Sequence, residues 1–409
     1  MFGVAGCGIT EAIKATMGVA EYRLFKPWLN DIANAGSNQE SQGYFTGSMR
    51  RIRFGITMSA MGFKVSTGLM QTLGLSVTIA NIGAKNTSKA MLHLYGNPAK
   101  TSDAVAVAME KSKVLVHRMK TMDREMSNAF KALENKSGPL ADLQEFSMKH
   151  IALIQMYSVD LPTWYGAYFK KMSELEASLD PNDFDTVEAL TARAEELSVQ
   201  AADWAVENFQ GSGSIKDQAA LMRDNSEYVK MYTMFMTFFS SQGNMTRDIT
   251  RGSRSGQINP INLAVKFAWL FGVTTAAEML VREGIPDDED EWDEFWQQYL
   301  VNVAMLPLAA IPLARDVASG AFSGYGYAGS PTAQFVSNSI SGVKGFTKSL
   351  WEGDEPTLFQ VKATTDVVTT MLGVPGTGQG WTTGKAIYDI REDGYDFSVH
   401  SLLLGTKKE

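Results

Sequence analysis

Hydrophobic residues recur every three or four positions over long stretches of the chain. The clearest stretch runs from Ser102 to Leu133, with apolar positions at Val105, Met109, Val116, Met119, Met126, Phe130 and Leu133. This spacing places the apolar side chains on one face of an α-helix. It predicts a single long helix over residues 102–134, about 48 Å in length, with Ser102 as its N-terminal cap.

A second long helix is predicted after Asp180–Pro181. Asp185 and Glu188 have the spacing of a capping box, in which two side chains satisfy free backbone N–H groups at a helix start. The apolar positions that follow are Val187, Leu190, Ala194, Leu197, Ala201 and Trp204. Their alternating spacing of three and four residues predicts a seam along which this helix packs against another.

The fold class follows from these patterns. Sustained alternation of β-branched and polar residues, which is typical of strands, is almost absent. We therefore predict a mainly α protein, an extended multi-helix array with long amphipathic helices and little or no β-sheet. Breaks near residues 135–139 and 251–260 divide it into an N-terminal helical region (1–137, with apolar helices in 52–84 and the long helix 102–134), a central helical region (138–255) and a C-terminal helical region (256–409).

Four stretches approach the apolar length of a membrane span: residues 65–84, 231–246, 261–281 and 295–314. The last is uncharged over twenty residues, which is the length that a spanning helix needs. It contains Pro307 and Pro312, however, and proline inside a helix kinks or breaks it. Three interpretations remain open: core helices of a soluble bundle, conditional insertion into a membrane, and a constitutive membrane protein. The mean hydropathy of −0.12 argues against a chain that crosses the membrane many times.

Composition narrows the possible functions. The formal charge of −8 disfavours a protein that coats nucleic acid, which needs a basic surface. The local cluster of Arg50, Arg51 and Arg53 is either a phosphate contact or, more commonly, a solvated helix end. The single cysteine, Cys7, excludes an intrachain disulfide and a cysteine-based zinc site. The 22 methionines serve as core filling or as surfaces that repack against changing partners.

Candidate catalytic motifs are weak. Glu40–Ser41 followed by Gly68–Gln71 (GLMQ) resembles pieces of the lytic transglycosylase signature, in which a buried acid protonates the glycosidic oxygen. The gap between the two pieces is too long and the accompanying motifs are missing, so GLMQ is interpreted as part of an apolar helix. The four histidines lie far apart and lack metal-ligand spacing. We therefore expect no catalytic residue, no cofactor and no metal.

Two further stretches have simple structural interpretations. The glycine-rich segment 373–386 (GVPGTGQGWTTGKA) fails the phosphate-loop pattern, because Gln379 stands where a glycine is required and Ala386 follows Lys385. We predict a turn there. The acidic run at 287–294 (DDEDEWDE) lacks the alternating ligands of a calcium loop, and acidic residues favour a helix N-terminus. It predicts a helix start.

Three segments together resemble a known group of proteins. They are DLPTWYGAYFKK (160–171), KDQAALMRDNSEYVKMYTMFMTFFSSQGNMTRD (216–248) and LPLAAIPLARDVASGAFSGYGYAGSP (306–331). Their order is similar to the C-terminal helical region of tailed-bacteriophage and prophage internal virion (DNA ejection) proteins and of large polyvalent proteins. The resemblance covers roughly residues 144–381. The N-terminus carries no secretory signal, and the chain is expected to be the distal part of something longer.

The resemblance implies a non-enzymatic protein that is packaged in the virion and assists genome delivery across the host envelope. It implies other virion proteins and further copies of the chain as partners, with conditional contact to the host membrane. The expected location is the virion, then the host envelope, inner membrane or cytoplasm. Direct DNA contact is open, since the net charge does not favour it. The alternatives are a bacterial membrane-active or scaffold protein and, ranked below it, a lytic transglycosylase-like cell-wall hydrolase.

The residues that carry the resemblance are Trp164, Tyr165, Tyr168, Phe235, Pro312, Arg315, Asp316, Gly324, Tyr325 and Pro331. Proline is tolerated at the first turn of a helix, so a short helix is predicted to begin near Pro312. Adjacent residues point to different sides of a helix, so Arg315 and Asp316 are expected to bind separate partners. Arg315 is predicted to anchor a glycine-rich loop whose tyrosines fold back onto the apolar helices. The segment is thus predicted to be a folded corner.

Overall fold

The computed structural model describes residues 11–12, 14–16, 18–33, 44–178, 187–214, 218–224, 226–309, 331–392 and 399–405 of the 409-residue chain. These ranges are helical nearly throughout and contain no β-strand. The predicted mainly α, multi-helix fold is therefore confirmed.

The helices of the first third of the chain are α2 (Val19–Ala33), α3 (Tyr44–Met61), α4 (Val65–Thr72), α5 (Gly74–Ile82), α6 (Ala84–Tyr95), α7 (Pro98–Lys111), α8 (Lys113–Thr121) and α9 (Arg124–Leu133). Those of the middle are α10 (Pro139–Gln155), the π-helix η2 (Met156–Asp160), α11 (Leu161–Ser178), α12 (Val187–Phe209), the 3₁₀ turn η5 (Ala220–Arg223), α13 (Glu227–Tyr232) and α14 (Thr237–Arg254). The remaining elements are α15 (Pro260–Phe267), the π-helix η6 (Ala268–Val273), α16 (Thr274–Glu283), α17 (Glu289–Ala309), α19 (Pro331–Glu352), α20 (Leu358–Leu372), α21 (Thr377–Glu392) and α22 (Val399–Leu404).

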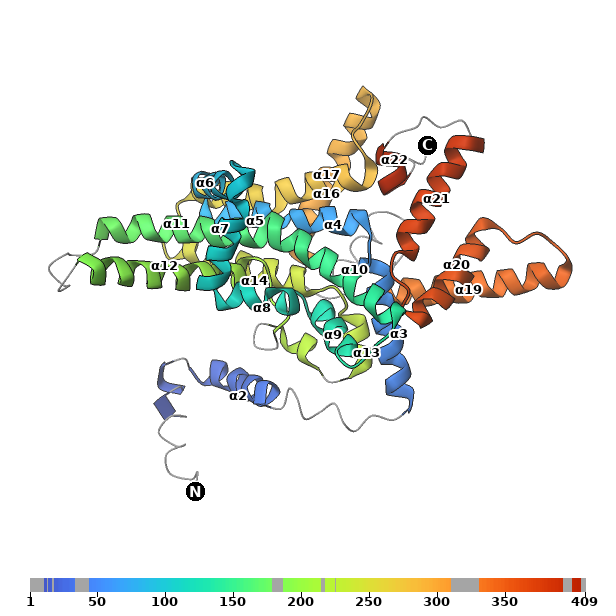
Figure 1. The fold of residues 1–409 in the computed structure, drawn as a ribbon, viewed down its shortest axis with the longest axis horizontal. Coiled ribbons are helices and arrows are strands. Elements are labelled where there is room, and N and C mark those ends of the chain that lie inside the picture. The colour runs from blue at the N-terminus through green and yellow to red at the C-terminus, as the bar shows by residue number, and fades with distance from the viewer. Residues whose placement is uncertain are drawn as a thin grey trace, which may run out of the picture.

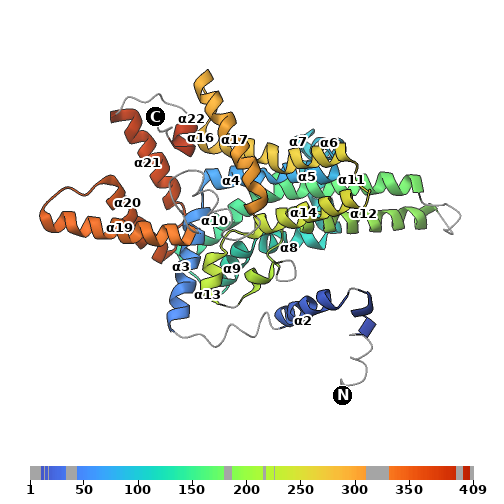
Figure 2. The ribbon, with the colours of Figure 1, turned by 180° about the vertical axis from the view of Figure 1, so that it is seen from behind.

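The helices form an elongated body (Figure 1). The pair α11 and α12 lies at one end, and the hairpin of α19 and α20 projects at the opposite end. Seen from behind, α14 lies over α12 (Figure 2), and α15 and η6 pack on α5. Helix α2 lies apart from the body in both views and is joined to it by the ion pair between Asp31 and Arg223, at 2.9 Å.

The single helix expected over residues 102–134 is wrong, because the chain forms α7, α8 and α9 there. The side chain of Ser112 accepts a hydrogen bond from the Leu115 N–H at 3.0 Å, and that of Asp123 accepts from the Glu125 N–H at 2.7 Å. Serine and aspartate thus offer the backbone caps that compete with a continuous helix. Helix α7 is capped by Asn97 rather than by Ser102, which lies inside it.

The seam expected along α12 is also shifted. Val187 and Trp204, which belong to the predicted stripe, are exposed. The buried face consists of Ala194, Ser198, Ala202, Ala205 and Val206. Small side chains allow a neighbouring helix to approach closely, and α11 packs there. Val187 and Trp204 therefore lie outside the contact. The start of α12 at Val187 leaves Asp185 outside the described residues.

Two predictions near the C-terminus have different outcomes. The acidic run does begin a helix: Glu289, Asp290 and Glu291 form the first turn of α17. Helix α17 runs through Pro307 to Ala309, and the second helical piece predicted from Pro312 lies outside the described residues. A proline this close to a helix end removes one intrahelical hydrogen bond, which the preceding turns tolerate. The turn predicted over 373–386 ends early, because α21 begins at Thr377.

The apolar core consists of three clusters. The first surrounds Trp164 and joins α6, α7, α8, α11 and α12. The second is rich in methionine and joins α3, α9 and α10; its buried members include Met58, Met122, Met126 and Met148. The third joins α5 and α14 to η6. The methionines of the second cluster are core filling, the commoner of the two roles considered for them.

Glycines set how closely α20 approaches α3 and α19. A Cβ atom on Gly55 of α3 would lie 1.8 Å from the carbonyl oxygen of Thr370 on α20. A Cβ atom on Gly342 of α19 would lie 2.0 Å from the Cβ of Ala363 on α20. No real side chain fits at either position, so both helix crossings depend on glycine.

Candidate functional site

The structure brings the three expected aromatic residues of α11 together. The ring of Trp164 stacks on Tyr168 with 5.4 Å between centroids and 10° between planes. The ring of Tyr165 meets Trp164 edge-on at 5.0 Å. Trp164 and Tyr165 are buried in the first core cluster, and Tyr168 packs against it. The three rings therefore lie in or against the interior of the body.

The polar contacts of this cluster also join helices. The Trp164 indole N–H donates to Asp203 Oδ1 at 2.8 Å, and the hydroxyl of Ser112 donates to the same oxygen. Burial raises the pKa of Asp203, while these two hydrogen bonds lower it. The Tyr165 hydroxyl donates to the Ala104 carbonyl at 2.6 Å. Burial, with a smaller contribution from the neighbouring tyrosine, raises the pKa of Tyr165 to about 12. These groups join α7, α8, α11 and α12.

The other expected residues are dispersed. Phe235 has a left-handed backbone with φ of 61° and packs against the methionine-rich cluster. Pro331 is the first residue of α19. The others, Pro312, Arg315, Asp316, Gly324 and Tyr325, lie outside the described residues. The folded corner predicted for that segment therefore stays a prediction.

A buried ion pair that sequence reasoning missed joins Arg118 and Asp160. The guanidinium Nε donates to Asp160 Oδ2 at 3.0 Å and Nη2 donates to Oδ1 at 3.3 Å. The same guanidinium donates to the backbone carbonyls of Gly211 at 2.8 Å and Gln210 at 3.1 Å. The side chains of Arg118 and Asp160 are 1% and 0% exposed. Burial raises the pKa of Asp160, and the arginine opposes that rise.

A second buried network lies between α3, α9 and α13. Arg53 donates to Glu125 at 3.0 Å and to Glu227 at 3.1 Å. Arg124 donates to Glu125 at 2.6 Å and to the Thr233 carbonyl at 2.8 Å. The interpretation of Arg53 as part of a solvated helix end or phosphate contact is therefore wrong, because its charge is buried and paired. Paired burial of this kind fixes which helices meet.

The sequence did contain a signal for the first of these pairs. Arg118 lies three residues after Leu115 and four before Met122, so it occupies the register of a buried face. A charged residue in such a register requires a buried partner. The identity of that partner, Asp160, is decided by the packing of α8 against η2.

The structure gives no geometry for the transglycosylase-like motif. Glu40 and Ser41 lie outside the described residues, and Gly68–Gln71 lies within α4, as the helical interpretation of GLMQ predicted. Within the described part of the chain, no group of three or more histidine, cysteine or acidic residues is placed to hold a metal ion.

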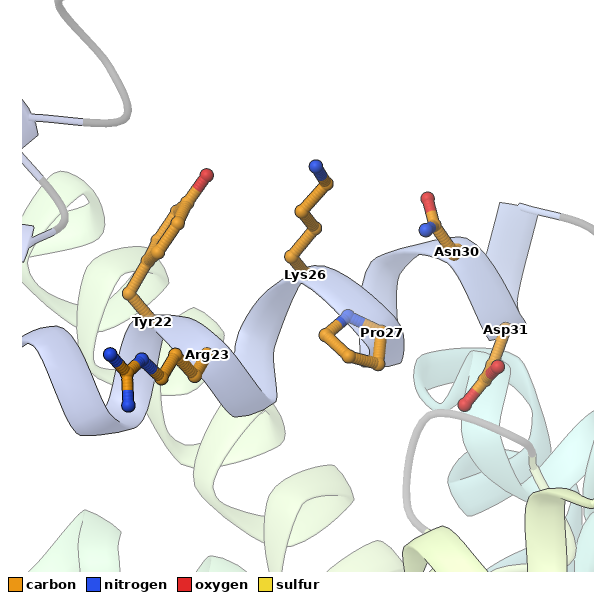
Figure 3. A pocket seen from close by; sticks show the side chains of 6 residues that line it. All are labelled: Tyr22, Arg23, Lys26, Pro27, Asn30 and Asp31. Atoms are coloured by element: carbon orange, nitrogen blue, oxygen red, sulfur yellow. The ribbon is translucent and has the colours of Figure 1, made fainter.

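An open hollow runs along α2 (Figure 3). Its lining residues are Tyr22, Arg23, Lys26, Pro27, Asn30 and Asp31, all from this one helix. Tyr22, Lys26 and Asn30 point to the same side, while Asp31 points to the opposite side. Side chains that diverge from a single helix do not enclose a ligand, so we assign no binding site to this hollow.

The C-terminal part of the body carries an unusual apolar surface. We call the segment from Pro260 to Val301, which comprises α15, η6, α16 and the first part of α17, the apolar hairpin. Its exposed large apolar side chains are Ile261, Val265, Val273, Ile285, Trp292, Trp296, Leu300 and Val301. Apolar side chains that gather on a protein surface mark contacts with partners or membranes, which makes this segment a candidate contact surface.

The first arm of the hairpin also meets the criterion for a membrane span. Among the described residues, one helix is long and apolar enough to cross a membrane, namely Pro260–Val281, and 28% of its apolar window is buried. The π-helix η6 lies in the middle of this arm. The second arm, α17, projects from the body in both views (Figures 1 and 2). The hairpin is the best candidate for a functional surface.

Comparisons with protein-family models, with curated proteins and with solved structures find no match for this chain.

Proposed function

We propose that this chain is a non-enzymatic, virion-associated protein of a tailed bacteriophage or prophage. In this proposal it acts as an internal or ejection protein that assists genome delivery across the host envelope. It does so by helix–helix assembly with other virion proteins and with further copies of itself, and by conditional association with the host membrane. Its location is the virion and, after delivery, the host envelope or cytoplasm.

The observation that carries the proposal is the apolar surface of the C-terminal helices. Beyond residue 255, the buried hydrophobic residues among those described are Leu270, Phe271, Met279, Phe295, Ala363 and Ala386. Exposed ones are more numerous and include Trp296 at 51% and Trp351 at 93%. The apolar side chains of this part of the chain are therefore largely not buried by the chain itself. Contact with partner helices or with lipid would bury them.

The rest of the body supports an architectural role. Buried charged side chains such as Arg118 and Asp160 join helices through ion pairs. The proposed contact with DNA remains secondary, because a net charge of −8 repels phosphate. Protein partners and lipid are the primary ones.

Mass spectrometry of purified virions from an induced lysogen or a phage stock tests the proposal directly. We expect peptides of this chain at a fixed copy number per particle, and their retention after the particles are washed at high salt. The absence of the chain from particles that contain their other structural proteins would refute the virion assignment.

Vesicle flotation tests the membrane part separately. We expect the purified chain to float with vesicles of phosphatidylethanolamine and phosphatidylglycerol, and Trp296→Gln to reduce the floated fraction. Trp204→Gln is the matched control, since Trp204 on α12 is 57% exposed but lies outside the apolar hairpin. Equal flotation of the two variants, or no flotation at any pH and lipid composition, would contradict membrane association through this surface.

A bacterial membrane-active or scaffold protein is the second candidate. The apolar helix Pro260–Val281 favours it equally, because that feature depends on lipid and not on a virus. The neighbouring genes distinguish the two origins. An adjacent portal or tail gene supports the phage assignment, and a position within a metabolic operon contradicts it.

A further inference from the structure

The arm Pro260–Val281 packs against α5 by one face. Leu270 and Phe271 of η6 are buried with Val77 and Ala80 of α5 in the third core cluster. The opposite face carries exposed apolar residues such as Ile261. A bilayer would replace the apolar contacts of the buried face with equally apolar lipid contacts. Lipid does not replace the polar contacts between the arm and α5, so these contacts are lost when the arm enters a bilayer.

Two such polar contacts are present. The hydroxyl oxygens of Ser76 on α5 and Thr274 on α16 lie 2.7 Å apart in a buried position. Ser76 is placed to donate its own hydrogen to the Leu73 carbonyl at 2.7 Å, so Thr274 is the donor between the two hydroxyls. The ammonium of Lys266 on α15 donates to the Ala80 carbonyl at 2.8 Å.

Two electrostatic effects act on Lys266: burial and the nearby ammonium of Lys170 lower its pKa, while the end of α5 attracts a cation. Ala80 lies in the last turn of α5, where the carbonyl groups lack intrahelical partners and the helix dipole is negative. A cation at this end stabilises α5 and ties the arm to it. Within the packed state, the lysine of the arm is therefore satisfied by the body.

The charges that flank the arm favour a bilayer as the alternative partner. Arg251 and Arg254 lie in the last turn of α14, directly before the arm, and attract anionic lipid headgroups. The acidic run that opens α17 follows at the other end. The arm thus follows two arginines and has an apolar length sufficient to cross a membrane. Arg282 and Glu283 come directly after it, before the acidic start of α17.

We propose that the contacts Ser76–Thr274 and Lys266–Ala80 form a polar latch that holds the arm Pro260–Val281 against α5, and that opening this latch frees the arm to enter an anionic bilayer. The inference rests on the membrane association proposed above, and it adds the element that makes this association conditional. The latch controls how often the arm leaves the body, and the bilayer captures the released arm.

The chain offers a matched pair of variants to test the latch. Thr274→Val removes the hydroxyl that binds Ser76. Thr275→Val makes the same chemical change one residue later, where within the described residues the buried hydroxyl has no hydrogen-bond partner. Both variants increase the hydrophobicity of the arm equally. Ser76→Ala breaks the latch from α5 and leaves the sequence of the arm unchanged.

Two measurements on the full chain are needed: hydrogen–deuterium exchange of residues 260–283 without lipid, and flotation with vesicles of phosphatidylethanolamine and phosphatidylglycerol. Loss of one buried hydrogen bond is expected to speed exchange of the arm about fivefold in Thr274→Val and Ser76→Ala. Both variants are also expected to float more than the wild type. Thr275→Val removes no hydrogen bond, so it is expected to exchange no faster than the wild type and to float less than Thr274→Val.

Each outcome decides one of the two proposals. Equal exchange of the arm in Thr274→Val and Thr275→Val overturns the latch, whether or not the protein floats. Faster exchange in Thr274→Val and Ser76→Ala, with no flotation of any variant, supports the latch and refutes the proposed membrane function. Circular dichroism checks that each variant folds. If Thr274→Val is unfolded, the exchange rate of the arm in Ser76→Ala, which lacks one buried hydroxyl of α5, tests the latch instead.

Discussion

Replacing Asp160 by asparagine tests the buried ion pair at the centre of the body. The change keeps the shape of the side chain and removes its charge. Arg118 would retain its hydrogen bonds to the carbonyls of Gly211 and Gln210, but its charge would have no counterion in a position that is 1% exposed. The free energy of unfolding should fall.

Breaking a buried pair by removing one partner costs about 3–5 kcal/mol, because the remaining charge stays buried without compensation. At a denaturant dependence of about 3 kcal/mol per molar urea, a loss of about 4 kcal/mol lowers the unfolding midpoint by about 1.3 M. The double variant Arg118→Met with Asp160→Leu removes both charges. It should recover part of this loss, since replacement of a buried pair by apolar residues is often neutral or stabilising.

Urea unfolding followed by circular dichroism at 222 nm measures these differences. Glu134→Gln provides the control, because it breaks the ion pair to Lys120, whose side chains are 64% and 54% exposed. Exposed pairs contribute about 0–1 kcal/mol, so the control should shift the midpoint little. Similar midpoints for Asp160→Asn and Glu134→Gln would refute the argument that burial makes the first pair important.

Two further predictions concern helix packing and pH. Gly55→Ala should separate α3 from α20, because its Cβ would overlap the Thr370 carbonyl oxygen. The C-terminal helices should then be destabilised and cleaved faster in limited proteolysis. Gly47→Ala on the same helix has nothing within 4 Å of its Cβ and should leave proteolytic susceptibility unchanged. Burial raises the pKa of Asp203 above 3.8, so the folded protein binds this proton more tightly than the unfolded chain. Stability should therefore be highest below pH 3.8 for this group and fall as the pH rises through the raised pKa. In thermal melts between pH 3 and pH 7, Asp203→Asn should flatten that part of the profile, and an unchanged profile would contradict it.

The helical periodicity was sufficient to predict the mainly α fold class. It failed where a polar side chain interrupts a regular stripe. Ser112 and Asp123 lie inside an unbroken apolar pattern, yet each caps a new helix by accepting a backbone N–H. Whether such a residue points to solvent or caps the backbone depends on the packing of the neighbouring helices.

The seam of α12 illustrates the same limit. Its large apolar residues predicted the contact face, but α11 packs on the small residues around Ala202 and leaves Trp204 exposed. The sequence pattern is compatible with two adjacent contact faces on α12, one with large apolar residues and one with small residues. The close packing of α11 determines that the face with small residues forms the contact.

For the candidate site, the sequence by itself determined that residues 261–281 form an apolar stretch with a single lysine and a single glutamate. It left open whether that stretch belongs to a core or to a membrane. The tertiary structure decided which face is covered and by which groups, placing Lys266 on the end of α5 and Thr274 beside Ser76. The sequence determines local helix formation because neighbouring residues set the backbone preferences and the apolar period. The partners of buried polar groups lie far away along the chain, and only the packing of the helices brings them together.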